Sequence, residues 1–302
     1  MSTQVLVKKA KTTGKPRNSR VVLLLLLPGI FYLGLFFITP FVSLITTSLQ
    51  APVLGGGIGV YQPGLEFGNY VFVVTEYFDQ IIRSFIYATL ATLLALAISY
   101  PIAYFIAVKA RNRPVLQALL LTLVIAPFFI SFLLRTFAWK QVFGQNSWLS
   151  NILRDTGLMA DDQFLLGSSF AVVFGLTYNF IPFMTLPLYT NLERLDTALL
   201  EAGSDLYATP TSTFWKVTFP LSIPGITSGT LLTFIPIAGD FVTASGSFLG
   251  TPSTSMIGNV IEANYITIQD FPSASALSVL LMAAIVVLVS VYIRRTGTED
   301  LL

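Results

Sequence analysis

Six long apolar stretches decide what this chain can fold into. They cover residues 21–49, 81–108, 115–139, 165–192, 220–243 and 271–293. An α-helix needs about 20 apolar residues to cross the hydrocarbon core of a bilayer, and lipid offers no partner to a backbone that is not helical. Only 11% of the 302 residues are charged, whereas a soluble domain has about 25%. We therefore predict an all-α integral membrane protein with six transmembrane helices in residues 21–293.

The middle stretches differ from the others in their proline content. Proline inside a helix removes a hydrogen bond and kinks the helix, and neighbouring helices must then satisfy the freed carbonyls. The prolines are Pro127 in the third stretch, Pro182 and Pro187 in the fourth, and Pro220, Pro224 and Pro236 in the fifth. They favour helices packed around a pathway, although membrane helices also carry proline for packing alone.

The placement of lysine and arginine sets the orientation, because these residues accumulate on the cytoplasmic side of a membrane. With the N-terminus inside, the cytoplasmic segments are 1–20, 109–114, 193–219 and 294–302. They hold six, three, two and two basic residues, thirteen of the seventeen in the chain. We therefore predict that both termini are cytoplasmic, with residues 1–20 and 294–302 as tails.

The outer segments, 50–80, 140–164 and 244–270, hold eight acidic residues and two basic ones. Such a face attracts cations. The alternative is that acids collect outside simply because lysine and arginine are kept inside.

Histidine and cysteine are both absent from the chain. Their absence excludes Ser-His and Cys-His catalysis, His-ligated or Cys-ligated metal and disulfides. The chain also lacks a G-x-x-x-x-G-K-[ST] phosphate loop, so we expect any ATPase that drives it to be a separate polypeptide. We expect no catalytic residue, no metal and no cofactor in this chain.

Residues 193–226 form a polar island between the fourth and fifth apolar stretches. Its charged side chains place it in water, and it is longer than a turn requires. Asp196 is suited to cap a helix that begins near residue 197. Pro210 ends that helix at about 207–209, and a second short helix is predicted over 211–217.

This island resembles the EAA loop of bacterial ABC-importer permeases, whose pattern is roughly Glu-Ala-Ala, three residues, glycine and a later I-x-L-P. The first part is matched by residues 201–203 (EAG), and the second by FPL at 219–221 with PGI at 224–226. Tyr207 stands where the pattern has glycine, so a turn that needs a positive φ there would be strained. The resemblance implies a cytoplasmic coupling helix, between spans 4 and 5, that docks on an ATP-binding subunit. The residues implied for this contact are Glu201, Ala202, Gly203, Asp205, Leu206 and Tyr207.

Most of the chain beyond the N-terminal tail resembles the B-type permease subunit of spermidine/putrescine importers. The similarity lies in residues 131–139 (SFLLRTFAW), 178–189 (YNFIPFMTLPLY), 239–242 (GDFV) and 257–261 (IGNVI). It implies the type I importer permease fold in a bacterial plasma (inner) membrane. The partners that it implies are two ATP-binding subunits carrying ATP and Mg, a second permease subunit and a soluble substrate-binding protein on the outer segments. Nucleic acid is not expected as a partner.

Asp240 is an acid near the outer end of the fifth stretch, and ionisable groups at such positions usually face a cavity or a partner. Its carboxylate is suited to an ammonium group, while Phe241, Tyr178, Phe180 and Trp139 offer aromatic faces to a cation. We therefore take Asp240, Phe241, Tyr178 and Trp139 as candidates for the substrate pathway. The alternative for Asp240 is a structural role, in interfacial water or as the cap of a helix end.

Arg135 is a second charge inside an apolar stretch. Its side chain either snorkels towards water or pairs with an acid on a partner subunit. We expect a structural role for it.

Three other functions stay open at this point. Permeases for ferric iron, thiamine or phosphonates share the EAA loop, so the class of transporter is better defined than its solute. An ion-coupled carrier would show inverted repeats and charges in mid-membrane, and we find few such charges and no convincing repeat. An intramembrane enzyme would need catalytic groups that are not apparent.

Overall fold

The computed structural model describes residues 19–160, 162–196, 198–199, 205 and 207–296. Helices make up almost all of its regular structure, which agrees with the predicted all-α class. The described strands are two antiparallel pieces, β1 (Ala51–Pro52) and β2 (Tyr61–Gln62), which pair Ala51 with Gln62. They form a hairpin directly after the first apolar stretch.

Four of the six apolar stretches form continuous helical segments. The first comprises α1 (Ser19–Leu33), the π-helical η1 (Gly34–Ile38) and α2 (Thr39–Ser48). The second is α4 (Phe78–Tyr104) with η2 (Phe105–Lys109), the fourth is α8 (Ser169–Glu193), and the sixth is α14 (Phe271–Thr296). Among the described helices, these four are long and apolar enough to cross a membrane.

The third and fifth stretches are each bent at a short break, and in the third the break lies within the predicted 115–139. Here α5 (Pro114–Ile125) and η3 (Ala126–Phe129) meet α6 (Phe132–Val142) at 92°. The physical reason is local: Pro127 lies beside the break, and Ile130 and Ser131 have extended ψ angles of 132° and 135°.

The fifth stretch continues from the preceding polar segment through a second bend. The helices α10 (Pro210–Thr213), η4 (Phe214–Thr218) and α11 (Phe219–Leu221) meet α12 (Ile223–Ala238) at 59°. If each bent pair counts as one span, the described chain has six candidate spans. The helix over the predicted 220–243 therefore starts at Ile223 and ends at Ala238.

Short helices occupy the predicted outer segments. They are α3 (Gly68–Glu76), α7 (Trp148–Asp155), the 3-10 turn η5 (Pro252–Thr254), α13 (Ile257–Glu262) and η6 (Ala263–Ile268).

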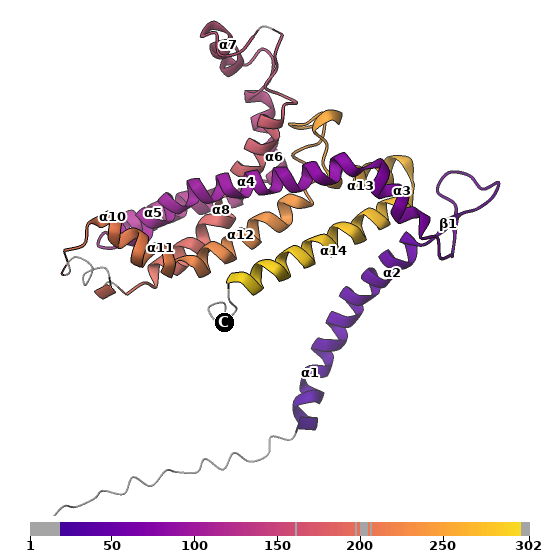
Figure 1. Ribbon diagram of the computed structural model, residues 1–302, viewed down its shortest axis with the longest axis horizontal. Coiled ribbons are helices and arrows are strands. Elements are labelled where there is room, and N and C mark those ends of the chain that lie inside the picture. Colours follow the sequence, from indigo (N-terminus) through magenta and orange to yellow (C-terminus); the bar gives the residue numbers. More distant parts are fainter. Residues whose placement is uncertain (1–18, 161, 197, 200–204, 206, 297–302) are drawn as a thin grey trace, which may run out of the picture.

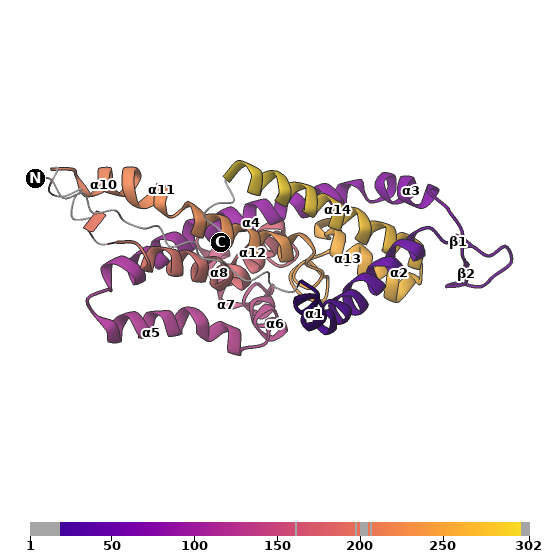
Figure 2. The same cartoon turned by 90° about the horizontal axis from the view of Figure 1, so that it is seen from below.

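The core of the bundle is the packing of α4, α8 and α12, which run side by side in both views (Figures 1 and 2). The Tyr87 hydroxyl on α4 donates to Ser169 Oγ on α8 at 2.6 Å, and Ser99 Oγ donates to the Ile181 carbonyl at 3.2 Å. These bonds link α4 and α8 at two levels.

Two glycines let α12 approach α8 closely. A Cβ built on Gly225 would lie 2.7 Å from Asn191 Cβ, and one on Gly229 would lie 2.8 Å from Met184 Sδ. The spacing of four residues puts both glycines on one face of α12, as in other close contacts between membrane helices. The side of α12 that faces α8 therefore has no room for a larger residue at either position.

The first helical segment lies largely outside this bundle. Its outer end, α2, lies near α14, whereas α1 points away from the other helices (Figure 1). None of its most apolar window is buried. This apolar surface therefore has to be covered by lipid or by another protein.

Candidate coupling hairpin and translocation pathway

The polar segment 193–226 begins with the predicted cap. Asp196 Oδ1 accepts a hydrogen bond from the Ala198 N–H at 2.9 Å, and Ala198 and Leu199 are helical. The carboxylate thus satisfies a free amide of the first turn. Asp205 is helical and exposed. The remaining predicted contact residues before the turn, Glu201, Ala202, Gly203 and Leu206, lie outside the described residues.

Tyr207 adopts the left-handed conformation that the sequence comparison with the EAA pattern suggested. Its φ is 57°, and its side chain is 97% exposed. Left-handed backbone brings Cβ close to the following carbonyl, which disfavours every residue with a side chain. Tyr207 therefore holds a conformation suited to glycine, and its ring has almost no packing against the described residues to compensate.

The second half of the hairpin starts at Pro210 instead of Thr211. Thr209 Oγ1 accepts from the Ser212 N–H at 3.2 Å and caps α10. Proline is well placed as the first residue of a helix because that position needs no backbone donor. Pro210 thus starts the second helix and also separates it from the first.

Five aromatic residues join this hairpin to the C-terminal end of α4. The Phe214 ring lies edge-on to Tyr100 and to Tyr104, at 5.7 Å between centroids in each case. Phe219 lies 6.0 Å from Tyr100 and 5.1 Å from Trp215. Such pairs contribute about 0.5–1.5 kcal/mol each beyond their area burial. We call these residues, Tyr100, Tyr104, Phe214, Trp215 and Phe219, the aromatic clasp.

A hydrogen bond and a guanidinium add to this attachment. Tyr100 Oη and Ser222 Oγ are 2.9 Å apart at the bend between α11 and α12. Arg111, in the short loop after η2, donates from Nη1 to the Leu195 carbonyl at 3.1 Å and from Nη2 to the Glu193 carbonyl. A cation is favourable at the C-terminal end of a helix such as α8. The hairpin is therefore held at its entry and at its exit, and a displacement of it reaches α4, α8 and α12.

Two of the pathway candidates are in contact. The Trp139 ring on α6 lies 5.3 Å from the Tyr178 ring on α8, in an edge-to-face arrangement. Trp139 also contacts Phe143 and Phe174. Phe180 is buried on α8 and lies 6.1 Å from Phe132. Aromatic side chains therefore pack on this part of α8 both at Tyr178 and at Phe180.

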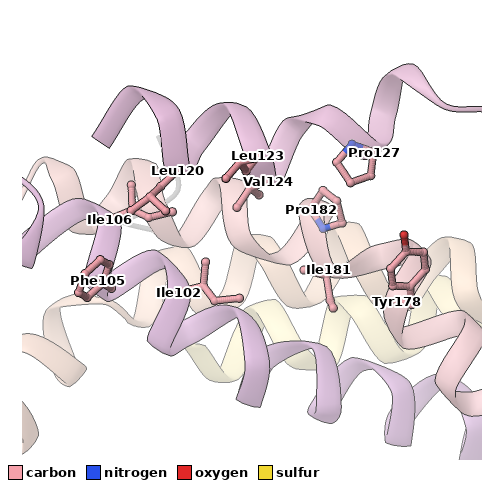
Figure 3. A pocket seen from close by; sticks show the side chains of 10 residues that line it. All are labelled: Ile102, Phe105, Ile106, Leu120, Leu123, Val124, Pro127, Tyr178, Ile181 and Pro182. Carbon is pink, nitrogen blue, oxygen red and sulfur yellow. The ribbon is translucent and has the colours of Figure 1, made fainter. Parts of the chain in front are cut away.

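Tyr178 also borders an apolar cavity of about 370 Å³ between α4, α5 and α8. Figure 3 shows its ring at one end, with the side chains of both α5 and η2 at the other. The other lining residues are Ile102, Phe105, Ile106, Leu120, Leu123, Val124, Pro127, Ile181 and Pro182. Tyr178 is the one polar side chain among these lining residues, so the cavity suits a hydrocarbon segment.

Asp240 follows α12 and is 7% exposed. Its Oδ1 accepts from the Thr243 N–H at 2.7 Å, and its Oδ2 accepts from Thr243 Oγ1 at 3.2 Å. The carboxylate therefore stabilises the turn after α12, which is the structural alternative that the sequence left open. A part in cation passage stays a prediction. Phe241 beside it is 49% exposed.

A second groove, of about 580 Å³, lies between α8 and α12. Its polar members are Thr190, Asn191, Arg194 and Ser228, and its apolar members are Phe128, Phe183, Leu186, Pro187, Pro224, Gly225 and Leu232. The polar side chains on α8 gather towards the C-terminal end of that helix, so the groove offers both polar and apolar contacts.

The family follows from residues 77–295, which match the binding-protein-dependent transport system inner membrane components. This chain belongs to that family. It is 34% identical over 239 residues to the spermidine/putrescine transport system permease protein PotB of Haemophilus influenzae, covering 79% of this chain and 82% of the relative. It is 35% identical over 221 residues to PotB of Escherichia coli, covering 73% and 78%.

Solved structures agree with this assignment at the level of the fold. A permease chain of a bacterial ABC transporter that imports alginate superposes with a TM-score of 0.66, covering 92% of this permease and 95% of that chain at 17% identity. A chain of the MetNI methionine ABC transporter gives 0.51, covering 75% and 94% at 18% identity. The predicted type I importer permease fold is thereby confirmed. The protein is a transport subunit of an inner membrane, and the ion-coupled carrier and the intramembrane enzyme are set aside.

Sequence reasoning missed the aromatic clasp and the cap formed by Arg111. A signal for the clasp was present, because Tyr100 and Tyr104 are four residues apart and share a helix face at the end of a span. Arg111 was counted only as a topology charge. Its contact with the end of α8 requires the chain to turn between η2 and α5, which no local pattern specifies.

Proposed function

We propose that this permease carries polyamines, spermidine or putrescine, as one half of the pathway of an ATP-driven importer. The observation that carries the proposal is the identity of 34–35% to two spermidine/putrescine permeases over about three quarters of the chain. The chemistry of the described residues supports it. Aromatic faces at Trp139 and Tyr178 suit ammonium groups, and the apolar cavity beside Tyr178 suits the methylenes between them.

The cytoplasmic hairpin couples ATP hydrolysis to movement of the permease. Residues 193–226 dock on a separate ATP-binding subunit that holds ATP and Mg, and two such subunits serve two permeases. Support comes from the hairpin's attachment to α4 and α8, which gives a force on it a direct route into the bundle. The distribution of lysine and arginine supports the orientation, with both termini and this hairpin in the cytoplasm.

A second, similar permease completes the pathway, and a soluble binding protein delivers the solute outside. The uncovered apolar surface of α1 and α2 supports a second membrane subunit. The groove between α8 and α12 offers polar and apolar contacts on one side of a route that another subunit would close. The surface for the binding protein is provided by the β1–β2 hairpin together with α3, α7 and α13.

Purification of the assembled complex and measurement of its ATP hydrolysis test this function. We expect a several-fold stimulation when a binding protein loaded with spermidine or putrescine is added. The matched controls are the same binding protein without solute and binding proteins loaded with thiamine, phosphonate or ferric iron. Stimulation by one of these other solutes alone contradicts the polyamine assignment. A complex that contains no nucleotide hydrolase contradicts the coupling role.

A further inference from the structure

Arg135 is a buried cation, and two of its three guanidinium nitrogens have no hydrogen-bond partner in the described part of the chain. It lies in the first turn of α6, directly after the break at 130–131, and is 7% exposed. Both Nε and Nη1 are covered and donate no hydrogen bond to a described residue, whereas Nη2 is not among the covered atoms. The guanidinium carbon lies 5.9 Å from the centroid of the Phe132 ring.

Such a group is costly where it stands. A guanidinium carries five N–H donors and keeps its charge, so it does not escape burial by losing a proton. Charges at membrane depth are paired or face water, because an unpaired one is expensive there. The neighbouring residue shows the contrast, since Thr136 Oγ1 accepts from Asn179 Nδ2 at 3.0 Å and also donates to the Phe132 carbonyl. Arg135 therefore requires an acceptor from outside the described chain.

The surroundings of Arg135 identify the kind of acceptor. α6 leaves the bundle after the bend (Figure 1), and its outward faces expose Leu133 at 49%, Leu134 at 63% and Phe137 at 47%. Acyl chains cover such a face but provide no acceptor for a guanidinium. A carboxylate does so through a charge-assisted hydrogen bond to Nη2, the nitrogen that the described chain leaves uncovered. A partner that supplies both an apolar surface and an acid is a membrane protein.

We propose that Arg135 pairs with a carboxylate of the second permease subunit, at an interface formed by α6. This inference rests on the proposed function, because it assigns a contact to the subunit that completes the pathway. It also resolves a conflict within that function. Trp139 lies four residues after Arg135 on the same face of α6, and an unpaired guanidinium beside the aromatic pair would repel a polyamine. An ion pair removes that repulsion.

The test measures how much of the second permease is retained by the tagged chain in the purified importer. Replacement of Arg135 by methionine keeps an unbranched apolar stem but removes the guanidinium, which leaves the partner's acid buried and unpaired and is strongly unfavourable. We expect Arg135→Met to lower the retained second permease tenfold or more. The matched control is Lys140→Met on the same helix, since Lys140 Nζ already donates to the Ser247 carbonyl at 2.8 Å. We expect less than a twofold change for it.

A charge exchange separates the interface from a folding defect. Arg135→Asp is combined, one position at a time, with replacement of membrane-depth acids of the second permease by arginine. Restored assembly and uptake in one combination supports the pair. Full retention of the second permease by Arg135→Met overturns the proposed ion pair. The proposal is also overturned if native mass spectrometry shows that Arg135→Met loses bound anionic phospholipid and no second permease. If the unaltered complex contains no second permease, the proposed function fails instead.

Discussion

Replacing Tyr207 by glycine removes the strain of its left-handed backbone conformation and so tests the coupling hairpin directly. A residue with a side chain pays about 1–2 kcal/mol in this conformation, whereas glycine does not. Glycine also makes the open chain more flexible, which returns about 0.4–1 kcal/mol. Because the Tyr207 ring is 97% exposed, its removal loses almost no packing within the chain. Tyr207→Gly should therefore stabilise the closed hairpin by about 1 kcal/mol relative to Tyr207→Ala.

The comparison of glycine with alanine isolates the backbone, because both variants lack the phenol ring. Hydrogen–deuterium exchange of the permease in lipid nanodiscs reports the local opening of residues 207–213. A difference of 1 kcal/mol corresponds to about fivefold slower exchange in the glycine variant than in the alanine variant. Equal exchange in the two variants would refute the left-handed strain. Loss of coupled ATP hydrolysis in both, with tyrosine alone active, would show in addition that the ring contacts the ATPase.

Three further changes test the packing, the clasp and the pathway. Gly225→Ala places a methyl group 2.7 Å from Asn191 Cβ, so it should lower the free energy of unfolding by about 1–3 kcal/mol in a thermal unfolding experiment. The control Gly29→Ala has open space around it and should cause no loss. Phe214→Ala removes two edge-to-face contacts with α4 and should lower transport per ATP hydrolysed at least twofold, while Phe214→Tyr should not. Asp240→Asn keeps an acceptor for its turn but removes the charge, so undiminished uptake of labelled polyamine would contradict a role in cation passage.

The sequence was sufficient for the features that depend on local chemistry. Apolar length alone located the six stretches, because lipid tolerates little else. The cap at Asp196 followed from one carboxylate before a helical pattern, and the structure confirms its hydrogen bond to Ala198. The conformation of Tyr207 followed from its alignment with a glycine in the EAA pattern. Each of these depends on a few neighbouring residues.

Features that depend on packing could not be predicted in the same way. Pro127 predicted a kink in the third stretch. The angle of 92° also needs extended backbone at Ile130 and Ser131, and neither residue type predicts that conformation. Arg135 was recognised as a charge in an apolar stretch. That two of its nitrogens lack partners is a property of how α6 lies against α8, which only the folded chain reveals.

The arrangement of the contacts also determines which parts of the permease move together. Hydrogen bonds join α4 to α8 at two levels, and the glycine contact of Gly225 and Gly229 joins α8 to α12. The aromatic clasp and Arg111 attach the cytoplasmic hairpin to this same group of helices. We therefore expect the hairpin, α4, α8 and α12 to move as one body when an ATPase pushes on it. Relative motion is then left to the bend before α6 and to the segment α1–α2, both of which expose apolar side chains.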